Sequence, residues 1–251
     1  MLTALFFVTA LIYACVGFGG GSTYNALLVL NDTDYRILPF IALGCNIIVV
    51  SGGVWHFARA GHIKLNHILP WIVFSVPAAW LGGFITVSES IFIGLLGGAL
   101  LLSGVKMLWP DKHEPTQTKA AIKPVSSYYV PLLVGLILGF IAGLTGIGGG
   151  IFLAPILHFV RWSNSKNIAG ACSLFILVNS CAGIIGQMMK INDSGFIFSA
   201  LSSYWLLLIA VLIGGQIGSW LGALKINMRA VKMLTALLIL YVAIRLLHSL
   251  F

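Results

Sequence analysis

Apolar residues fill most of this chain in long segments, and short polar stretches separate them. A helix of about 20 apolar residues crosses the roughly 30 Å hydrocarbon core of a bilayer. By this measure the sequence predicts apolar segments of membrane length at residues 2–30, 37–57, 68–87, 91–108, 128–160, 168–189, 204–224 and 231–250. The pattern therefore predicts an all-α polytopic membrane protein.

Composition supports this class. Charged residues make up 8% of the chain and hydrophobic residues 59%, whereas a soluble domain carries about 25% charged residues. The net charge of +8 comes from basic residues in short loops between apolar segments, where membrane topology places them, so we do not expect nucleic-acid binding. No basic region precedes the first apolar segment, and the first basic residue is Arg36, so a cleaved signal peptide is not expected.

Two glycine runs interrupt otherwise apolar segments at residues 17–21 and 146–150, both of the form Gly-x-Gly-Gly-Gly. Each glycine in a helix interior costs about 1 kcal/mol relative to alanine, so both segments should break there. Broken backbone is tolerated in a membrane only where it is buried in protein or lines a cavity. Two broken helices at matching positions indicate the central site of a transporter, although close helix packing is an alternative role for the glycines.

The chain reads as a diverged duplication. The glycine runs lie 129 residues apart, residues 44–46 resemble 171–173, and residues 80–83 resemble 220–223. We expect an N-terminal repeat at 1–108, a linker at 109–127 with several prolines and most of the mixed charge, and a C-terminal repeat at 128–251.

Basic residues predict the orientation. They gather in alternate loops and in the linker: Arg59, Lys64, Lys106, Lys112, Lys119, Lys123, Arg161, Lys166, Lys225, Arg229 and Lys232. The positive-inside rule makes these stretches cytoplasmic, so segment 128–160 must enter and leave on one side as a re-entrant hairpin. One hairpin and three crossings per half give two inverted repeats with both termini outside. Eight simple crossings are the alternative.

The short helices expected after the glycine runs suit an anion. A helix N-terminus presents unpaired N–H groups and roughly half a positive charge, and glycines allow close approach to the backbone. The substrate-binding residues predicted on this basis come from the two tips and the segment after each: Gly19, Gly20, Gly21, Ser22, Thr23, Asn25, Asn46, Gly148, Gly149, Gly150, Ile151 and Ser173. Secondary candidates for a polar pathway are Asn179, Gln187 and Gln216, and those for thiol chemistry are Cys45 and Cys172.

Other chemistries lack their signatures. No Gly-x-x-x-x-Gly-Lys loop is present, which argues against ATP hydrolysis, and no cofactor or metal site is predicted. No ionisable residue marks the centre of a span, so the coupling ion, H⁺ or Na⁺, stays open. His56 and His158 stand toward the ends of their segments and are interpreted as interfacial.

The doubled Gly-x-Gly-Gly-Gly, with Ile151-Phe152-Leu153-Ala154-Pro155-Ile156-Leu157 after its second copy, resembles the TauE/SafE family of membrane permeases. Trp220-Leu221-Gly222, followed by a basic turn and a last span, resembles it too. The resemblance covers nearly the whole chain. It implies export or uptake of sulfite, sulfoacetate or related organosulfonates across a bacterial inner membrane, with both predicted outside termini in the periplasm. One departure is Ala26, where the second copy has Pro155.

The sequence therefore predicts a secondary permease, not an enzyme, that alternates access to a midplane anion site. A passive anion channel and a membrane enzyme or sulfur-relay protein using Cys45 and Cys172 are the alternatives. Substrate, direction of transport, coupling ion and oligomeric state are not fixed by these patterns.

Overall fold

The computed structural model describes residues 1–108, 129–160, 162–190 and 204–224, with single positions between 233 and 248. The predicted linker at 109–127 and most of the last predicted span lie outside the described residues. So do four of the basic residues used for orientation outside the linker: Arg161, Lys225, Arg229 and Lys232.

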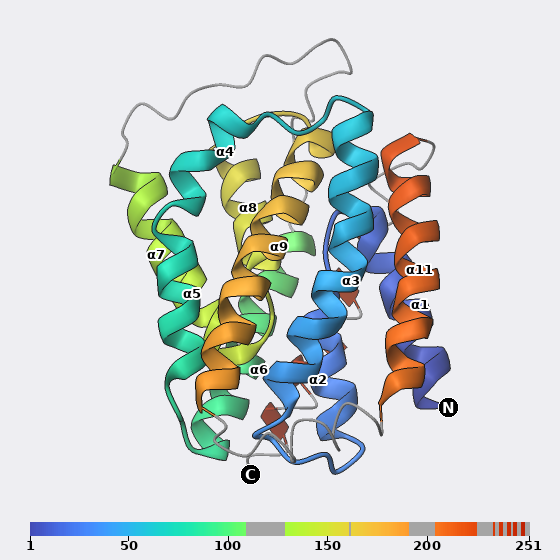
Figure 1. Cartoon of the computed structure of the whole chain (residues 1–251), viewed down its shortest axis with the longest axis vertical. Helices are drawn as coiled ribbons and strands as arrows, with labels where there is room; N and C mark the ends of the chain where they lie inside the picture. The colour runs from blue at the N-terminus through green and yellow to red at the C-terminus, as the bar shows by residue number, and fades with distance from the viewer. Residues whose placement is uncertain are drawn as a thin grey trace.

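All regular secondary structure in the described ranges is helical (Figure 1). The helices are α1 (Leu2–Cys15), α2 (Gly21–Val29), α3 (Leu38–Arg59), α4 (Leu65–Ile72), α5 (Ser75–Phe84), α6 (Glu89–Leu108), α7 (Tyr129–Thr145), α8 (Gly150–Phe159), α9 (Ser165–Lys190) and α11 (Trp205–Leu224). Four helical stretches are long and apolar enough to cross a membrane: α3, α4 with α5, α9 and α11.

The predicted span at 68–87 corresponds to the membrane-length stretch Leu65–Phe84, which is made of two helices. α4 ends at Ile72 and α5 begins at Ser75. Pro77 explains the interruption, because it has no N–H to donate to the carbonyl of Val73 and its ring crowds that carbonyl.

The long helices pair across the two halves of the chain, and α3 packs against both α9 and α11. α1 packs chiefly against α11, and α5 packs against α7 and α9 (Figure 1). Glycines make these approaches close. A Cβ atom placed on Gly143 of α7 would collide with the backbone carbonyl of Ala79, and one placed on Gly222 of α11 would collide with that of Cys15.

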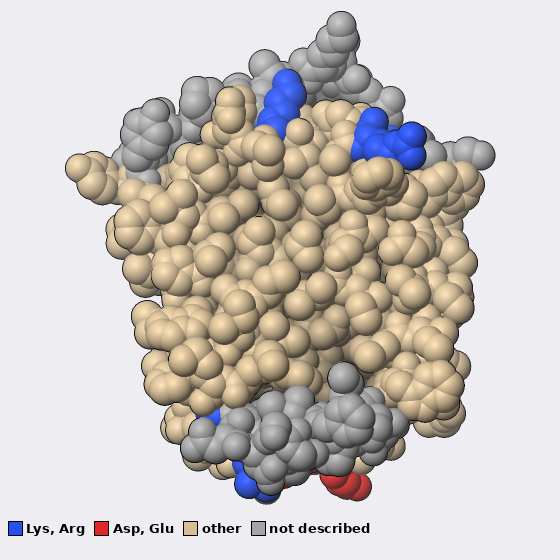
Figure 2. Space-filling view, in the orientation of Figure 1, with Lys and Arg blue, Asp and Glu red and all other residues tan. Residues whose placement is uncertain are grey.

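The broken helices enter the molecule from opposite ends. In Figure 1, α1 and α2 extend from the end that holds the N-terminus toward the middle and back, whereas α7 and α8 do so from the other end. Figure 2 shows a broad belt without described charged residues between these two ends on the visible face. Such a belt matches the hydrocarbon region of a bilayer.

Candidate functional site

Each glycine run forms a turn between two helices. α1 ends at Cys15 and α2 begins at Gly21, while α7 ends at Thr145 and α8 begins at Gly150. We call residues 16–20 the first break and residues 146–149 the second break. Both contain left-handed backbone, which glycine adopts without the steric cost that a Cβ atom brings.

The left-handed positions largely match between the breaks. φ is +80° at Gly17 and +74° at the equivalent Gly146, and it is +90° at Gly20 and +79° at the equivalent Gly149. Gly148 is also left-handed, with φ of +83°. Gly20 and Gly149 are the N-cap residues of α2 and α8. The glycines are therefore required by the turn geometry itself.

Asn46 of α3 joins the two breaks. Its Oδ1 accepts a hydrogen bond of 2.9 Å from the N–H of Gly21, at the start of α2. Its Nδ2 donates to the carbonyls of Gly146 and Ile147 at 3.3 and 3.2 Å. The side chain is fully buried. One neutral amide thus satisfies backbone groups on both sides of the centre.

Ser173 of α9 makes the corresponding contact on the other side. Its hydroxyl donates to the carbonyl of Gly17 at 3.0 Å and approaches the carbonyl of Ala169 at 3.1 Å. Asn46, from the first half of the chain, thus bonds Gly146 in the second break. Ser173, from the second half, bonds Gly17 in the first break. The sequence equivalence of Asn46 and Ser173 is thus matched by equivalent contacts.

The polar residues of α2 lie buried beside the first break, but most of their polar groups already have partners. The Thr23 and Tyr13 hydroxyls share a hydrogen bond of 2.6 Å. Asn25 Nδ2 donates to the carbonyl of Thr145 at 2.6 Å. Ser22 is 1% exposed. The Thr23 hydroxyl and the Asn25 amide nitrogen, both predicted as substrate-binding groups, are therefore already bonded within the protein.

Backbone donors remain available at the start of both short helices. Within the described ranges, no group accepts a hydrogen bond from the N–H of Ser22 or Thr23 in α2, or of Gly150 or Ile151 in α8. A helix N-terminus carries roughly half a positive charge as well as these unpaired donors. The two starts can therefore bind an anion without lysine or arginine.

Several buried polar atoms near the breaks have no hydrogen-bond partner among the described residues. They are Tyr24 Oη, Asn25 Oδ1, Asn179 Oδ1, Ser180 Oγ and Gln187 Oε1. A buried polar atom without a partner costs about 1–3 kcal/mol, so such atoms often mark functional positions. The sequence analysis did not single out Tyr13, Tyr24 or Ser180. Their only signal was a hydroxyl within an apolar segment.

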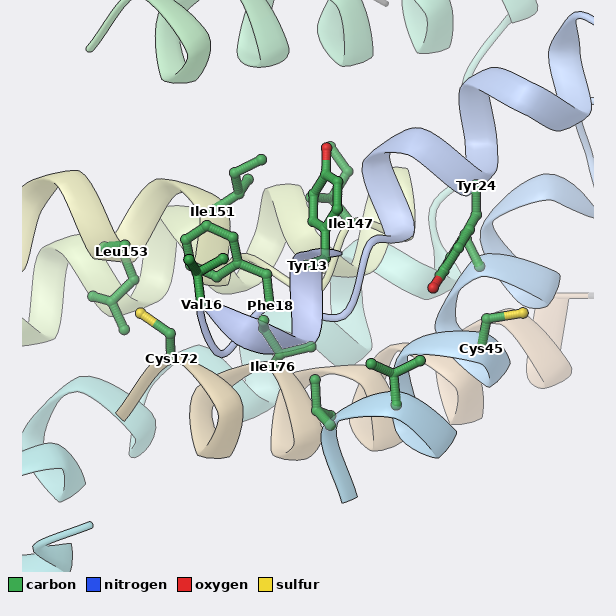
Figure 3. Packing of buried hydrophobic residues seen from close by; sticks show 14 of the residues in the cluster. Tyr13, Val16, Phe18, Tyr24, Cys45, Ile147, Ile151, Leu153, Cys172 and Ile176 are labelled. Atoms are coloured by element: carbon green, nitrogen blue, oxygen red, sulfur yellow. The ribbon is translucent and has the colours of Figure 1, made fainter. Parts of the chain in front are cut away.

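Of the remaining predicted residues, Ile151 has apolar contacts, whereas Asn179 and Gln216 have polar side chains within or between helices. Ile151 of α8 packs with Phe18 and Ile147 of the breaks in the main apolar cluster (Figure 3). Asn179 donates to the carbonyl of Phe175, one turn earlier in α9, at 2.9 Å. Gln216 of α11 borders Gly52 of α3, where a Cβ atom would collide with its amide.

The cysteines are not brought together. Both Cys45 and Cys172 are buried free thiols, and Figure 3 places them on opposite sides of the cluster. A relay of sulfur between them lacks the proximity it would need. The described residues contain no group of three or more histidine, cysteine, aspartate or glutamate side chains placed to hold a metal ion.

An all-helical chain with four membrane-length helical spans and two buried helix breaks is a polytopic membrane protein. The model of the sulfite exporter TauE/SafE family matches residues 2–246, so the chain belongs to that family. A probable membrane transporter protein, y4hK of Sinorhizobium fredii, is 29% identical over 98% of this chain and 97% of its own length. Another, YunE of Bacillus subtilis, is 21% identical over 99% of this chain and 97% of its own length. No solved structure matches. The family and these relatives are named as membrane transporters, not enzymes.

Proposed function

We propose that this protein is a secondary transporter for a small sulfur-containing anion such as sulfite, sulfoacetate or a related organosulfonate. The observation that carries the proposal is the meeting of two broken helices in the buried centre, with unpaired N–H groups at Ser22, Thr23, Gly150 and Ile151. Helix N-termini of this kind bind anions, and discontinuous helices form the substrate sites of many transporters. The family description adds sulfite as the first substrate to test.

The two halves act in this proposal as inverted repeats around the anion site. The opposite directions of the two broken helices and the reciprocal contacts of Asn46 and Ser173 support that relation. The site then opens alternately to either side. We place the linker at 109–127 in the cytoplasm and both termini in the periplasm. The connection between α3 and α4, which holds Arg59 and Lys64, lies at the end of the molecule opposite the N-terminus, and basic loops are cytoplasmic. A cysteine introduced into the linker should not react with an impermeant thiol reagent in intact cells. Reaction there would refute this orientation.

Purified protein in liposomes tests the function directly. Uptake of sulfite, thiosulfate, sulfoacetate, taurine and sulfate is compared with empty liposomes, with and without Na⁺ and pH gradients. Saturable uptake of at least one sulfur anion, accelerated by the same anion inside the vesicles, is expected. Uptake that does not saturate and follows the membrane voltage alone would indicate a passive channel. Absence of uptake and of binding for all five compounds, of which taurine is a zwitterion, would refute the proposal.

A further inference from the structure

Ser180 of α9 has a fully buried hydroxyl whose oxygen has no hydrogen-bond partner among the described residues. The hydroxyl lies against the second break, because a Cβ atom placed on Gly148 would be 3.2 Å from Ser180 Oγ. A hydroxyl left unpaired in this way costs about 1–3 kcal/mol. A ligand that accepted its hydrogen bond would remove that cost.

The backbone next to Ser180 is arranged as an anion site. Gly149 is left-handed and the next residue, Gly150, opens the right-handed helix α8; consecutive N–H groups at such a change of hand form concave anion-binding nests. The N–H groups of Gly150 and Ile151, which open the ten-residue helix α8, have no acceptor among the described residues. The unpaired hydroxyl of Ser180 on α9 thus lies beside the second break, and the unpaired N–H groups follow that break at the start of α8.

At the first break, the N–H group of the first helical residue already has an acceptor, unlike its equivalent at the second break. The N–H of Gly21, the first residue of α2, already donates to Asn46 Oδ1. The Thr23 hydroxyl is paired with Tyr13, and the Asn25 amide nitrogen donates to Thr145. Asn25 and Asn46 thus hold the two breaks together. The N–H of Gly150, which is equivalent to that of Gly21, has no such partner at the second break in the described part of the chain.

We propose that Ser180 Oγ and the N–H groups of Gly150 and Ile151 bind the charged oxygen atoms of the transported anion, so that its head lies at the second break. This assignment rests on the anion transport proposed above. All donors in the set are neutral, and α8 contributes only its partial positive charge. The site therefore suits a small oxyanion, whose negative charge is spread over several oxygen atoms.

Ser180→Ala tests the assignment in the full-length purified protein. Calorimetric titration with sulfite should show an affinity about 10- to 100-fold lower than wild type, the effect of removing one hydrogen bond to a charged ligand. Without anion, the unfolding temperature should stay the same or rise, because an unpaired buried hydroxyl has been removed. Ser180→Thr retains the hydroxyl and should bind sulfite within a few-fold of wild type. A structural role alone would lower the stability instead of the affinity.

Tyr24→Phe is the matched control, since it removes the other unpaired buried hydroxyl near a break. Its affinity should equal that of wild type. If Tyr24→Phe loses affinity and Ser180→Ala does not, the anion head lies at the first break and the assignment is wrong. Equal losses in both variants would mean that the anion bridges the breaks, which also overturns it. If wild type binds none of the five compounds, the proposed function itself fails, whereas normal binding by Ser180→Ala refutes only the role of Ser180.

Discussion

At the first break, α1 closes with hydrogen bonds made by its own backbone. The N–H of Phe18 donates to the carbonyl of Tyr13 at 2.9 Å, and the N–H of Gly17 donates to that of Ala14 at 3.1 Å. This pair of bonds around a left-handed glycine is the Schellman motif. From outside the segment, Ser173 adds a hydrogen bond to the carbonyl of Gly17.

At the second break, α7 closes with a single backbone bond of this kind, from the N–H of Gly146 to the carbonyl of Ala142 at 3.0 Å. This is the simpler αL motif, which leaves the carbonyl of Gly143 without its backbone partner. Gln187 of α9 takes that place, because its Nε2 donates to Gly143 at 3.2 Å.

Amide side chains also hold the carbonyls that follow. Asn25 of α2 donates to Thr145, and Asn46 of α3 donates to Gly146 and Ile147. The two breaks therefore share their glycine positions but not the chemistry that closes them. The first is largely self-contained, whereas the second depends on α2, α3 and α9. Movement between those helices must change the hydrogen bonds of the second break, and this links the second break to any change in access.

The largest expected effect comes from Gly143→Ala. Its equivalent at the first break is already alanine, Ala14, but a Cβ atom at Gly143 would collide with the carbonyl of Ala79 on α5. Since backbone cannot yield as a flexible side chain can, the free energy of unfolding should fall by about 3 kcal/mol or more. Chemical denaturation in detergent measures this. The control Ala14→Gly should cost about 1 kcal/mol. Equal stability of the two variants would contradict the close approach of α5 and α7.

Asn46→Ala should have an effect of similar size. It leaves the N–H of Gly21 and the carbonyls of Gly146 and Ile147 without their partner. Each buried group left unpaired costs about 1–3 kcal/mol. Ser173→Ala removes only the side-chain bond to Gly17 and one to its own helix, and should cost less. Unfolding of both variants under the same conditions gives the order. A larger loss for Ser173→Ala would mean that the first break is the more dependent one.

Gln187→Leu should have a smaller and more local effect. It removes the donor to Gly143, but it also removes the unpaired Oε1, so the net cost should be about 1 kcal/mol or less. Amide hydrogen exchange should become faster in residues 143–150 and stay unchanged in residues 14–21. Faster exchange at both breaks would show that they open together and that the first break is not self-contained.

The glycine runs allowed both breaks to be located from the sequence, because several left-handed turns within apolar helices require glycine. Asn46 and Ser173 were accessible as well, since the repeat places them at equivalent positions. Tyr13 and Ser180 could not be identified from the sequence, and neither could the carbonyl that Gln187 bonds. Their neighbours or partners lie on other helices, and the pairing depends on how those helices pack. Whether the predicted residues bind substrate stays a prediction.

The division of one span into α4 and α5 is not visible in the hydropathy, which is continuous through Val73 and Phe74; Pro77 alone marks the lost backbone bond. The polar sequence of α2 predicted donors for a ligand at Thr23 and Asn25. In the structure these side chains bond Tyr13 and Thr145, and whether they also bind substrate stays a prediction. Composition alone does not show whether a buried donor is free.

The smallest effect is expected in the segments that follow α2 and α8. After α8, Asn167 Nδ2 donates to Ser163 in a neutral contact. After α2, Asp34 pairs with Arg36, with 2.6 Å between Oδ2 and Nη2. Hydrogen bonds from Arg36 lower the pKa of Asp34. A lowered folded-state pKa stabilises the protein above the usual value of about 4, and the stabilisation is lost as the pH falls through the lowered pKa.

Asp34→Asn should therefore be slightly less stable than wild type near pH 7, and the two should converge as the pH is lowered toward 3. The difference is small because the pair is exposed, with 66% of the Arg36 side chain accessible, so water screens it. Unfolding temperatures in detergent across this range test the expectation. Because Asp34 lies beyond the outer end of α2, hydrogen exchange at residues 16–20 should not change. If it did, the loop after α2 would be coupled to the first break, and the self-contained closure of that break would be wrong.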